Sequence, residues 1–354
     1  MNVLPSKSPI RQTSLQDVAR HAGVSAAAVS YVVNGRLSEV GTETRKTIEA
    51  SIKALKYQPQ RRGLSLRLNR EFAIGLVIVD PNPNFLADPF TTQVVAGLSN
   101  ELVAPGYGLT VTGCLAIADL EKLLRRSIGV DAFVVMASGT PAMRARVYRL
   151  IAGRNHPFVV VQDSLARTVD DAAAVLQDDF DGANLLTQHL LSRGARRFLF
   201  AAPACIWPAI EQREKGIRRA LPDGAILSKV DCNEHDFEAT AEAINRALDQ
   251  GPLPDAIMGA NDQIAIAAMR VLERRGIRVP QEVLVTGYND FVFRNYVTPR
   301  LTTVASKASE IGHIAAKLLL QRLATGAFNQ RLVKLAVVLD LGGTTVEPEQ
   351  PAQT

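Results

Sequence analysis

The sequence predicts an α/β protein in two parts: a small N-terminal domain of three helices and a larger two-lobed body of doubly wound parallel sheets. The first observation is charge. Residues 1–70 hold 12 Lys and Arg against 4 Asp and Glu, a net charge of +8, whereas residues 71–354 hold 28 against 31, a net charge of −3. The second is that apolar strand-like runs alternate with amphipathic helical stretches beyond residue 72. Alternation of this kind predicts βαβ units, and a basic head suggests a polyanion-binding domain, with a solvated basic face as the alternative.

The head contains three predicted helices with a glycine turn between the first two. Ser14 can cap the first helix with Asp17 in the capping-box position, and Gly23 ends it. Ser25 caps a second helix, and a third begins near Thr42. This pattern predicts a helix-turn-helix, whose second helix enters the DNA major groove. Alanines at 26–28 are small enough for close approach to base edges, although their helix propensity explains them equally well one by one.

A basic segment, residues 59–71, follows the third helix and is predicted to be a hinge. Its arginines would face phosphates. Its leucines have no core of their own nearby, and an apolar wedge in the minor groove would explain one of them. A linker whose leucines pack on the neighbouring domain is the alternative.

The body is predicted to be two lobes with a cleft between them, since about 280 residues is large for one sheet of this kind. Strands are expected at 72–79, 108–113, 131–136, 157–161, 197–202, 226–230, 255–258 and 283–287. Helices are expected at 91–104, 141–153, 180–193, 209–220, 237–249 and 261–275.

Polar residues directly follow several of these strands. They include Asp163, Asn261 and Asn289. Ligands of open α/β sheets bind at the carboxyl ends of the strands, so these residues are candidate ligand contacts. Carboxylates and amides can bind paired hydroxyl groups, and an aromatic such as Phe237 or Trp207 can cover an apolar ring face. A sugar-sized polar ligand follows, while a helix cap or surface turn is the alternative for each residue alone.

Several stretches together resemble the lactose-repressor/galactose-repressor family of bacterial transcription regulators. In the head they are "LQDVARHAGVS", "AVSYVVNG", "TRKTIEASIKALKYQP" and "LSLR". In the body they include "DPFTTQVVAGL", "QREKGIRRAL", "PDAIMGANDQIAIAAMRVLERRGIRVP", "VLVTGYNDF" and "TPRLTTV". The resemblance covers nearly everything from residue 13 to about 340, which is far more specific than a helix-turn-helix pattern alone.

The resemblance implies a domain plan and two sets of site residues. A helix-turn-helix domain would span 1–58, with the hinge at 59–71, a periplasmic-binding-protein-like body at 72–345 and a tail at 346–354. Lobe one would hold about 72–161 and 307–325, and lobe two about 163–290 and 331–345. DNA contacts are expected from Ser14, Ser25, Ala26, Ala27, Ser30, Tyr31, Asn34, Thr44, Arg45, Tyr57, Gln60, Arg61, Gly63 and Leu66, the last at the position of the family's intercalating leucine. Effector contacts are expected from Asp88, Phe90, Asp163, Arg213, Phe237, Asn261 and Asn289.

Three departures from the family pattern affect these expectations. Asn289 stands where aspartate is usual, which weakens hydrogen-bond acceptance. Tyr31 stands where arginine is common, and with Ala26 and Ala27 it shifts the expected readout toward phosphate contacts and DNA shape. In the hinge, Gln60 replaces asparagine, and Gly63 should make a helix form less readily there.

We therefore expect a DNA-binding repressor that works as a homodimer on a palindromic operator, because one head reads only a few base pairs. A small-molecule effector, most simply a carbohydrate, would bind between the lobes, and no cofactor is expected. A purine-type, phosphorylated or absent effector stays open, as does a solute-binding protein without a DNA role, against which the basic head counts. Nucleotide-binding, hydrolase and metalloprotease motifs are missing from the sequence, so we expect no enzyme. Three cysteines and no apolar run near 18 residues suggest a cytoplasmic protein without a membrane span.

Overall fold

The computed structural model describes residues 13–33, 35–57, 70–126, 129–165, 169–205 and 207–346. The chain divides into two compact units, the head up to Arg70 and the body from Glu71 onward. Each unit is described by itself.

The head is a three-helix unit closed around a small core. Its elements are α1 (Leu15–Ala22), α2 (Ala26–Val33), the 3₁₀ turn η1 (Leu37–Glu39) and α3 (Thr42–Ala54). The Asp17 amide donates to Ser14 Oγ and the Ser14 amide donates to Asp17 Oδ2, so the predicted capping box is present. Gly23, with φ of 68°, turns the chain from α1 toward α2. Buried side chains from all three helices, led by Val18, Val29 and Ile48, hold them together.

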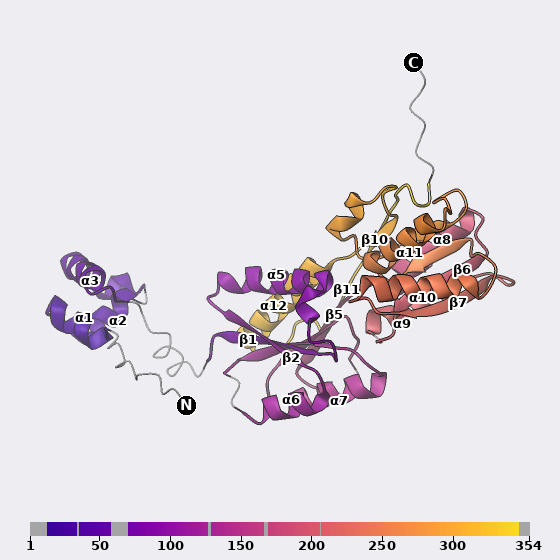
Figure 1. The fold of residues 1–354 in the computed structure, drawn as a ribbon. Coiled ribbons are helices and arrows are strands. Elements are labelled where there is room, and N and C mark those ends of the chain that lie inside the picture. The colour runs from indigo at the N-terminus through magenta and orange to yellow at the C-terminus, as the bar shows by residue number, and fades with distance from the viewer. Residues whose placement is uncertain are drawn as a thin grey trace, which may run out of the picture. The chain divides into compact units, whose positions relative to one another are not determined.

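Lobe one of the body is a six-stranded sheet in the order β11-β5-β4-β3-β1-β2, parallel throughout. The strands are β1 (Ala73–Val79), β2 (Gly108–Cys114), β3 (Ala132–Ala137), β4 (Phe158–Val161), β5 (Ala172–Gln177) and β11 (Leu332–Leu335). Helices α5 (Pro89–Val103) and α12 (Ala308–Thr325) cover one face, and α6 (Ile117–Leu124) and α7 (Pro141–Ala152) cover the other (Figure 1). Because both faces are covered, the central strands are continuous apolar runs.

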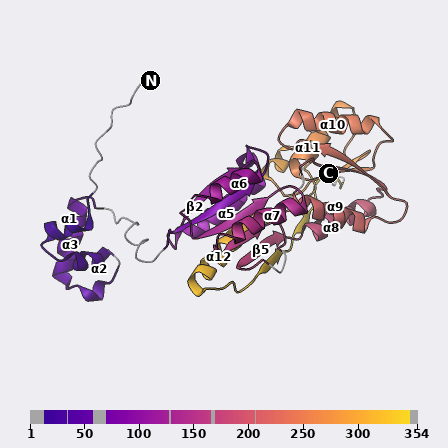
Figure 2. The same ribbon diagram turned by 90° about the horizontal axis from the view of Figure 1, so that it is seen from below.

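Lobe two is a four-stranded parallel sheet in the order β7-β6-β8-β9, accompanied by the antiparallel pair β10-β12. The strands are β6 (Arg197–Pro203), β7 (Ile226–Cys232), β8 (Ala256–Gly259), β9 (Leu284–Thr286), β10 (Thr303–Ala305) and β12 (Val338–Asp340). Helices α8 (Asp179–Ser192) and α9 (Pro208–Ala220) lie on one side of the sheet, and α10 (Phe237–Asp249) and α11 (Asp262–Arg274) on the other (Figure 2). Two short 3₁₀ turns, η2 (Phe85–Ala87) and η3 (Val292–Tyr296), complete the elements.

The chain passes between the lobes after β5, after β10 and after β11. This differs from the expected lobe boundaries, because β5 and β11 pair with each other in the sheet of lobe one. The expected change of lobe at residue 162 is therefore wrong, and so is the placement of 331–335 in lobe two. The reason is local: β5 begins with three alanines, which are poor strand formers, and so gives little strand signal in the sequence.

Gln177 and Asp178 join the three crossing segments. The Gln177 side-chain oxygen accepts from Ser306 Oγ (3.1 Å) and from the Lys307 amide (3.0 Å). The Asp178 amide donates to the Leu335 carbonyl at 2.8 Å. Movement of one crossing segment would therefore strain or break its hydrogen bonds to the other two. In the described part of the chain, no helix has the length and apolar character needed to cross a membrane.

Candidate functional site

The exposed start of α2 is the candidate DNA-reading surface of the head. Ser25 caps α2 by accepting from the Ala28 amide (3.2 Å), and Ser25, Ala26 and Ala27 are exposed. Ser30 and Tyr31, farther along the helix, are half-buried. The first three residues of α2 are alanines, so this turn contributes no long side chain of its own, which suits a close approach to DNA.

Other residues expected at DNA have different surroundings. Ser14 is exposed and engaged in the α1 cap. Thr44 and Arg45 lie half-buried in α3, and Arg45 donates to Glu49 at 2.7 Å. Tyr57, also expected at DNA, lies in the core of the head with 8% of its surface exposed, and burial raises the pKa of its hydroxyl. Five expected contacts lie outside the described residues: Asn34, Gln60, Arg61, Gly63 and Leu66.

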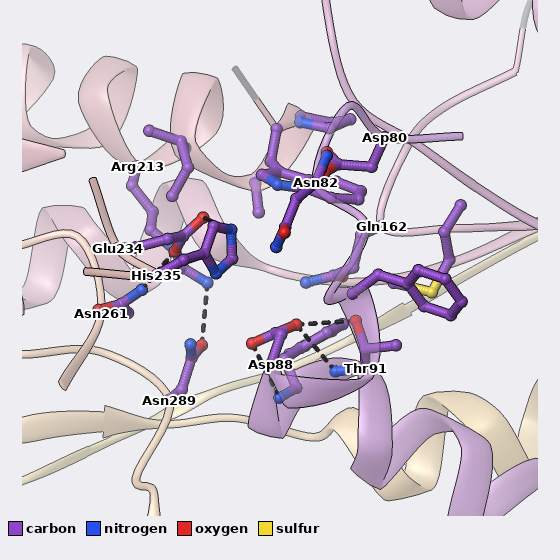
Figure 3. Close-up of a pocket in the computed structure, with 17 residues that line it drawn as sticks. Asp80, Asn82, Asp88, Thr91, Gln162, Arg213, Glu234, His235, Asn261 and Asn289 are labelled. Atoms are coloured by element: carbon purple, nitrogen blue, oxygen red, sulfur yellow. Dashed lines mark hydrogen bonds and ion pairs between the residues drawn. The ribbon is translucent and has the colours of Figure 1, made fainter. Parts of the chain in front are cut away.

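A pocket between the lobes brings together five of the seven residues expected at the effector. These five are Asp88, Phe90, Arg213, Asn261 and Asn289. The other lining residues are Asp80, Asn82, Phe85, Thr91, Met136, Gln162, Trp207, Pro208, Ala209, Ile210, Glu234 and His235. As Figure 3 shows, polar side chains from both lobes extend into one space. Several of them follow directly on strand ends, where a parallel sheet presents its binding residues.

Arg213 of α9 is held by lobe two on several sides. Its Nε donates to Asp179 Oδ1 (2.8 Å), Nη1 donates to the Ala260 carbonyl (2.5 Å), and Nη2 donates to Asn289 Oδ1 (3.1 Å). The guanidinium carbon lies 3.6 Å from the centroid of the Tyr288 ring. Because Arg213 and Asp179 are both buried, each depends on the other for charge compensation. A guanidinium has five N–H groups, so donors remain for a ligand.

A buried chain of hydrogen bonds connects the pocket with the crossing segments. Gln162, which lines the pocket, donates through Nε2 to Asp179 Oδ2 (3.3 Å) and accepts from the Gln177 amide (3.0 Å). The Gln177 side chain donates to Asp179 Oδ1 (3.1 Å). Gln177 also binds Ser306 and Lys307, as described above. A ligand that contacts Gln162 or Arg213 is therefore one or two hydrogen bonds away from Gln177, which joins the crossing segments.

Two pocket residues have left-handed backbone conformations. Gln162 has φ of 62° and Asn289 has φ of 104°. Such conformations cost about 1–3 kcal/mol for residues other than glycine and persist where surrounding structure enforces them. Here the conformation turns the Gln162 and Asn289 side chains toward the pocket, which supports a role in ligand binding for these two residues.

Glu234 has the most perturbed carboxyl group of the pocket. Burial, followed by the negative charges of Asp88 and Asp80, raises its pKa to about 7, against the opposing effect of Arg213. Its Oε2 accepts from Asn261 Nδ2 at 2.7 Å. Asp88, by contrast, accepts from the Phe90 and Thr91 amides as the N-cap of α5. The pocket can therefore accept several hydrogen bonds.

Two expected effector residues lie outside the pocket. Asp163 Oδ2 accepts from Arg144 Nε (2.8 Å) and from the Tyr148 hydroxyl (2.7 Å), so it faces α7 and not the cavity. Phe237 is 44% exposed and lines a separate hollow together with Ile266 and Val297. In the structure, the aromatic walls of the pocket are Phe85, Phe90 and Trp207.

Sequence reasoning missed several lining residues, of which Asp80, Gln162 and Glu234 are the most polar. The strand-end rule could have found all three, since Asp80 follows β1, Gln162 follows β4, and Glu234 lies two residues beyond β7. Asn82 has no such signal, because it lies in a loop where its backbone amide donates to the Asp80 carboxylate (2.8 Å).

The chain matches two family models. Residues 14–60 match the model for bacterial regulatory proteins of the lacI family, and residues 187–345 match the periplasmic binding protein-like domain. The HTH-type transcriptional repressor PurR of Erwinia tasmaniensis is 31% identical over 88% of this chain and 90% of its own length. The ribose operon repressor of Escherichia coli K12 is 28% identical over 92% and 98%.

Among solved structures, the lac repressor dimer bound to operator and the anti-inducer ONPF matches with a TM-score of 0.82 at 24% identity. The match covers 95% of this chain and 100% of that one, and it shows a shared fold. These findings confirm the predicted fold class. Since the PurR relative exceeds 30% identity over 90% of its length, the chain belongs to the lacI family of bacterial regulatory proteins.

Proposed function

We propose that this regulator binds a palindromic operator as a homodimer, in the cytoplasm, and that a small polar effector in the pocket between the lobes controls the affinity for DNA. The role is one of binding without chemical turnover. Support comes from the relatives, which carry the names of transcriptional repressors, and from the lac repressor structure, which is a dimer on operator. The exposed start of α2 would read the groove, with Ser25, Ala26 and Ala27 nearest the bases.

The observation that carries the control mechanism is the buried chain from the pocket to the crossing segments. An effector that binds Arg213 and Gln162 would change the strength of their hydrogen bonds to Asp179. Asp179 in turn accepts from Gln177, whose side chain joins the crossing segments. Each lobe arrangement then has its own affinity for the effector. A ligand shifts the population of two states by its difference in affinity for them, so operator affinity changes in turn.

Retention of sheared genomic DNA from the source organism by the purified protein, at near-physiological salt, tests the DNA role. Sequencing of the retained fragments should give a short inverted repeat, which establishes the operator and the dimer together. Retention that is independent of sequence and lost with modest added salt would contradict a specific operator and indicate phosphate contacts alone.

A variant of the buried chain tests the control mechanism on that operator. Asp179→Asn removes the negative charge that pairs with Arg213 but keeps the size and shape of the side chain. It should reduce the change in operator affinity that effector causes, and should affect operator binding without effector less. Asp181→Asn, on the same turn of α8 and exposed, is the matched control. An effector response of Asp179→Asn equal to that of the control would exclude the buried chain as the route.

A further inference from the structure

The pocket contains more negative than positive charge. Asp80 and Asp88 from lobe one and Glu234 from lobe two line it, whereas Arg213 is its one arginine among the described lining residues. The charge of Arg213 is already matched by Asp179, whose carboxylate lies 2.8 Å away. Asp80 is only 6% exposed, so water screens its charge poorly. The cavity is therefore unfavourable for an anion.

The three carboxylates affect one another across the cavity. The raised pKa of Glu234 has burial as its main cause, with Asp88 and Asp80 next. No group of three or more His, Cys, Asp and Glu side chains in the described part of the chain converges closely enough to hold a metal ion. The carboxylates thus surround a space of molecular size, and an organic cation fits that arrangement better than an ion bound at one point.

Hydrogen-bond donors point into the same space. The Asn82 Nδ2 is buried without a hydrogen-bond partner among the described residues, and in Figure 3 its amide extends between Glu234 and Asp88. The Asn289 side-chain oxygen accepts from Arg213, so the side-chain nitrogen of Asn289 points away from that arginine. A buried donor without a partner costs about 1–3 kcal/mol, so Asn82 favours a ligand oxygen at that point.

The walls and the size of the cavity limit the ligand further. Phe85, Phe90 and Trp207 provide apolar ring faces. The cavity volume is about 70 Å³, which is room for about five water molecules at ~15 Å³ each. This size favours a small ligand.

We propose that the pocket selects a small ligand that carries both hydroxyl groups and a protonated amine, such as an amino sugar, and rejects phosphorylated ligands. The ammonium group would lie among Asp80, Asp88 and Glu234, and the hydroxyl groups would meet Asn82, Asn289 and Arg213. This inference rests on the proposed function, because it concerns the effector of the same pocket. It goes further by naming the charge of the effector.

Calorimetric titration of the full chain at pH 7.5 with matched probes tests the proposal. The probes are glucose, galactose and mannose, the 2-amino form of each, and the 6-phosphates of the three amino sugars. A small matched pair, Tris and its uncharged analogue pentaerythritol, tests the charge preference independently of ring stereochemistry. We expect at least one amine to bind about tenfold or more tightly than its neutral counterpart, as charge-assisted hydrogen bonds predict, and no 6-phosphate to bind more tightly than its amine.

Variants locate the cation. Glu234→Gln should remove most of the preference for the amine while changing affinity for the neutral counterpart little. Asp80→Asn is the second variant if Glu234→Gln fails to fold. Glu214→Gln, on the outer side of α9 and paired with Arg218 and Lys229, is the matched control.

Each other outcome contradicts the proposal. The proposal is overturned if no amine binds about tenfold more tightly than its neutral counterpart, if any 6-phosphate binds more tightly than its amine, or if no amine binds at all. Operator binding by the same preparation is measured in parallel. A protein that binds operator and responds to a neutral or phosphorylated sugar would keep the proposed function and lose this inference, whereas failure to bind any operator would remove the proposed function itself.

Discussion

Two buried arginines in the body differ in what they hold together. Arg213 donates hydrogen bonds to Asp179, Ala260 and Asn289. All three belong to lobe two, so this cluster forms one wall of the pocket. Arg144 of α7 in lobe one donates to Asp163 of the same lobe and to Glu211 of lobe two, both at 2.8 Å. Movement between the lobes would leave the first cluster intact and separate the second. Arg213 is thus a wall residue of the pocket, whereas the Arg144–Glu211 pair depends on the arrangement of the lobes.

Arg213→Ala should produce the largest effect and would break the comparison on the pocket side. It leaves the buried carboxylate of Asp179 without its partner, so the free energy of unfolding of the body should fall by about 3–5 kcal/mol. The response to effector should vanish. Urea denaturation and operator titration with effector measure the two effects.

Arg218→Ala, in the same helix, is the control for Arg213→Ala. Arg218 forms an exposed pair with Glu214, so we expect a loss of about 0–1 kcal/mol. A loss of similar size for Arg213→Ala, or an unchanged effector response, would show that the buried pair does not organise the pocket.

Glu234→Gln should change the pH dependence of stability. The pKa of Glu234 is raised from 4.5 to about 7, so the folded protein holds a proton that the unfolded chain has released. The free energy of unfolding of the wild type should therefore fall as pH rises from 4.5 to 7, by about 3 kcal/mol from this group. Glu234→Gln should lack that part of the decrease.

Urea denaturation of both proteins at pH 5 and pH 7.5 measures the difference. The pKa of Asp262 is also raised to about 7, chiefly by burial, and its contribution is common to both proteins and cancels. Parallel curves for wild type and variant would mean that Glu234 is ionised at neutral pH, and that the cluster of carboxylates is weaker than its arrangement suggests.

A double-mutant cycle of Arg144→Met and Glu211→Gln sharpens the other side of the comparison. The pair is largely buried, so a coupling free energy of about 1 kcal/mol is expected. Arg146 and Glu121 form the matched pair, because Arg146 lies in the same helix but its partner is in lobe one. Loss of the Arg144–Glu211 pair should also make the lobes more open in small-angle X-ray scattering, whereas loss of the control pair should not. Equal scattering from both would show that the Arg144–Glu211 pair does not hold the lobes together.

Sequence reasoning predicted the fold class, because helix periodicity and apolar strand runs are local features of the chain. Of the five expected effector residues that line the pocket, Asn261 and Asn289 follow strand ends, whereas Asp88, Phe90 and Arg213 came from the family resemblance. The orientation of side chains is not local. Asp163 follows a strand, as a pocket residue should, but Arg144 and Tyr148 from α7 hold its carboxylate away from the cavity. In the same way, Tyr57 completes the core of the head, a packing role that its position in the sequence does not reveal.

Lobe membership depends on pairing between distant strands. β5 and β11 are about 155 residues apart in the sequence, yet they are neighbours in one sheet. The alanines of β5 and the alternating exposure of β11 do not indicate which sheet they join. Two correctly predicted strands, β2 and β7, are also partly exposed, so exposure alone does not explain the boundary error. The error falls where lobe membership depends on the pairing of distant strands.

Tyr148→Phe should have the smallest effect and decides the role of Asp163. The variant removes one hydrogen bond to Asp163 and leaves those from Arg144 and the Ser164 amide, so a loss of about 1 kcal/mol is expected. Effector affinity should stay unchanged, because Asp163 lies outside the pocket. An increase in effector affinity on Tyr148→Phe would mean that the freed carboxylate turns to the ligand. In that case Asp163 would serve either Arg144 or the effector, and the two arginine clusters would compete instead of acting separately.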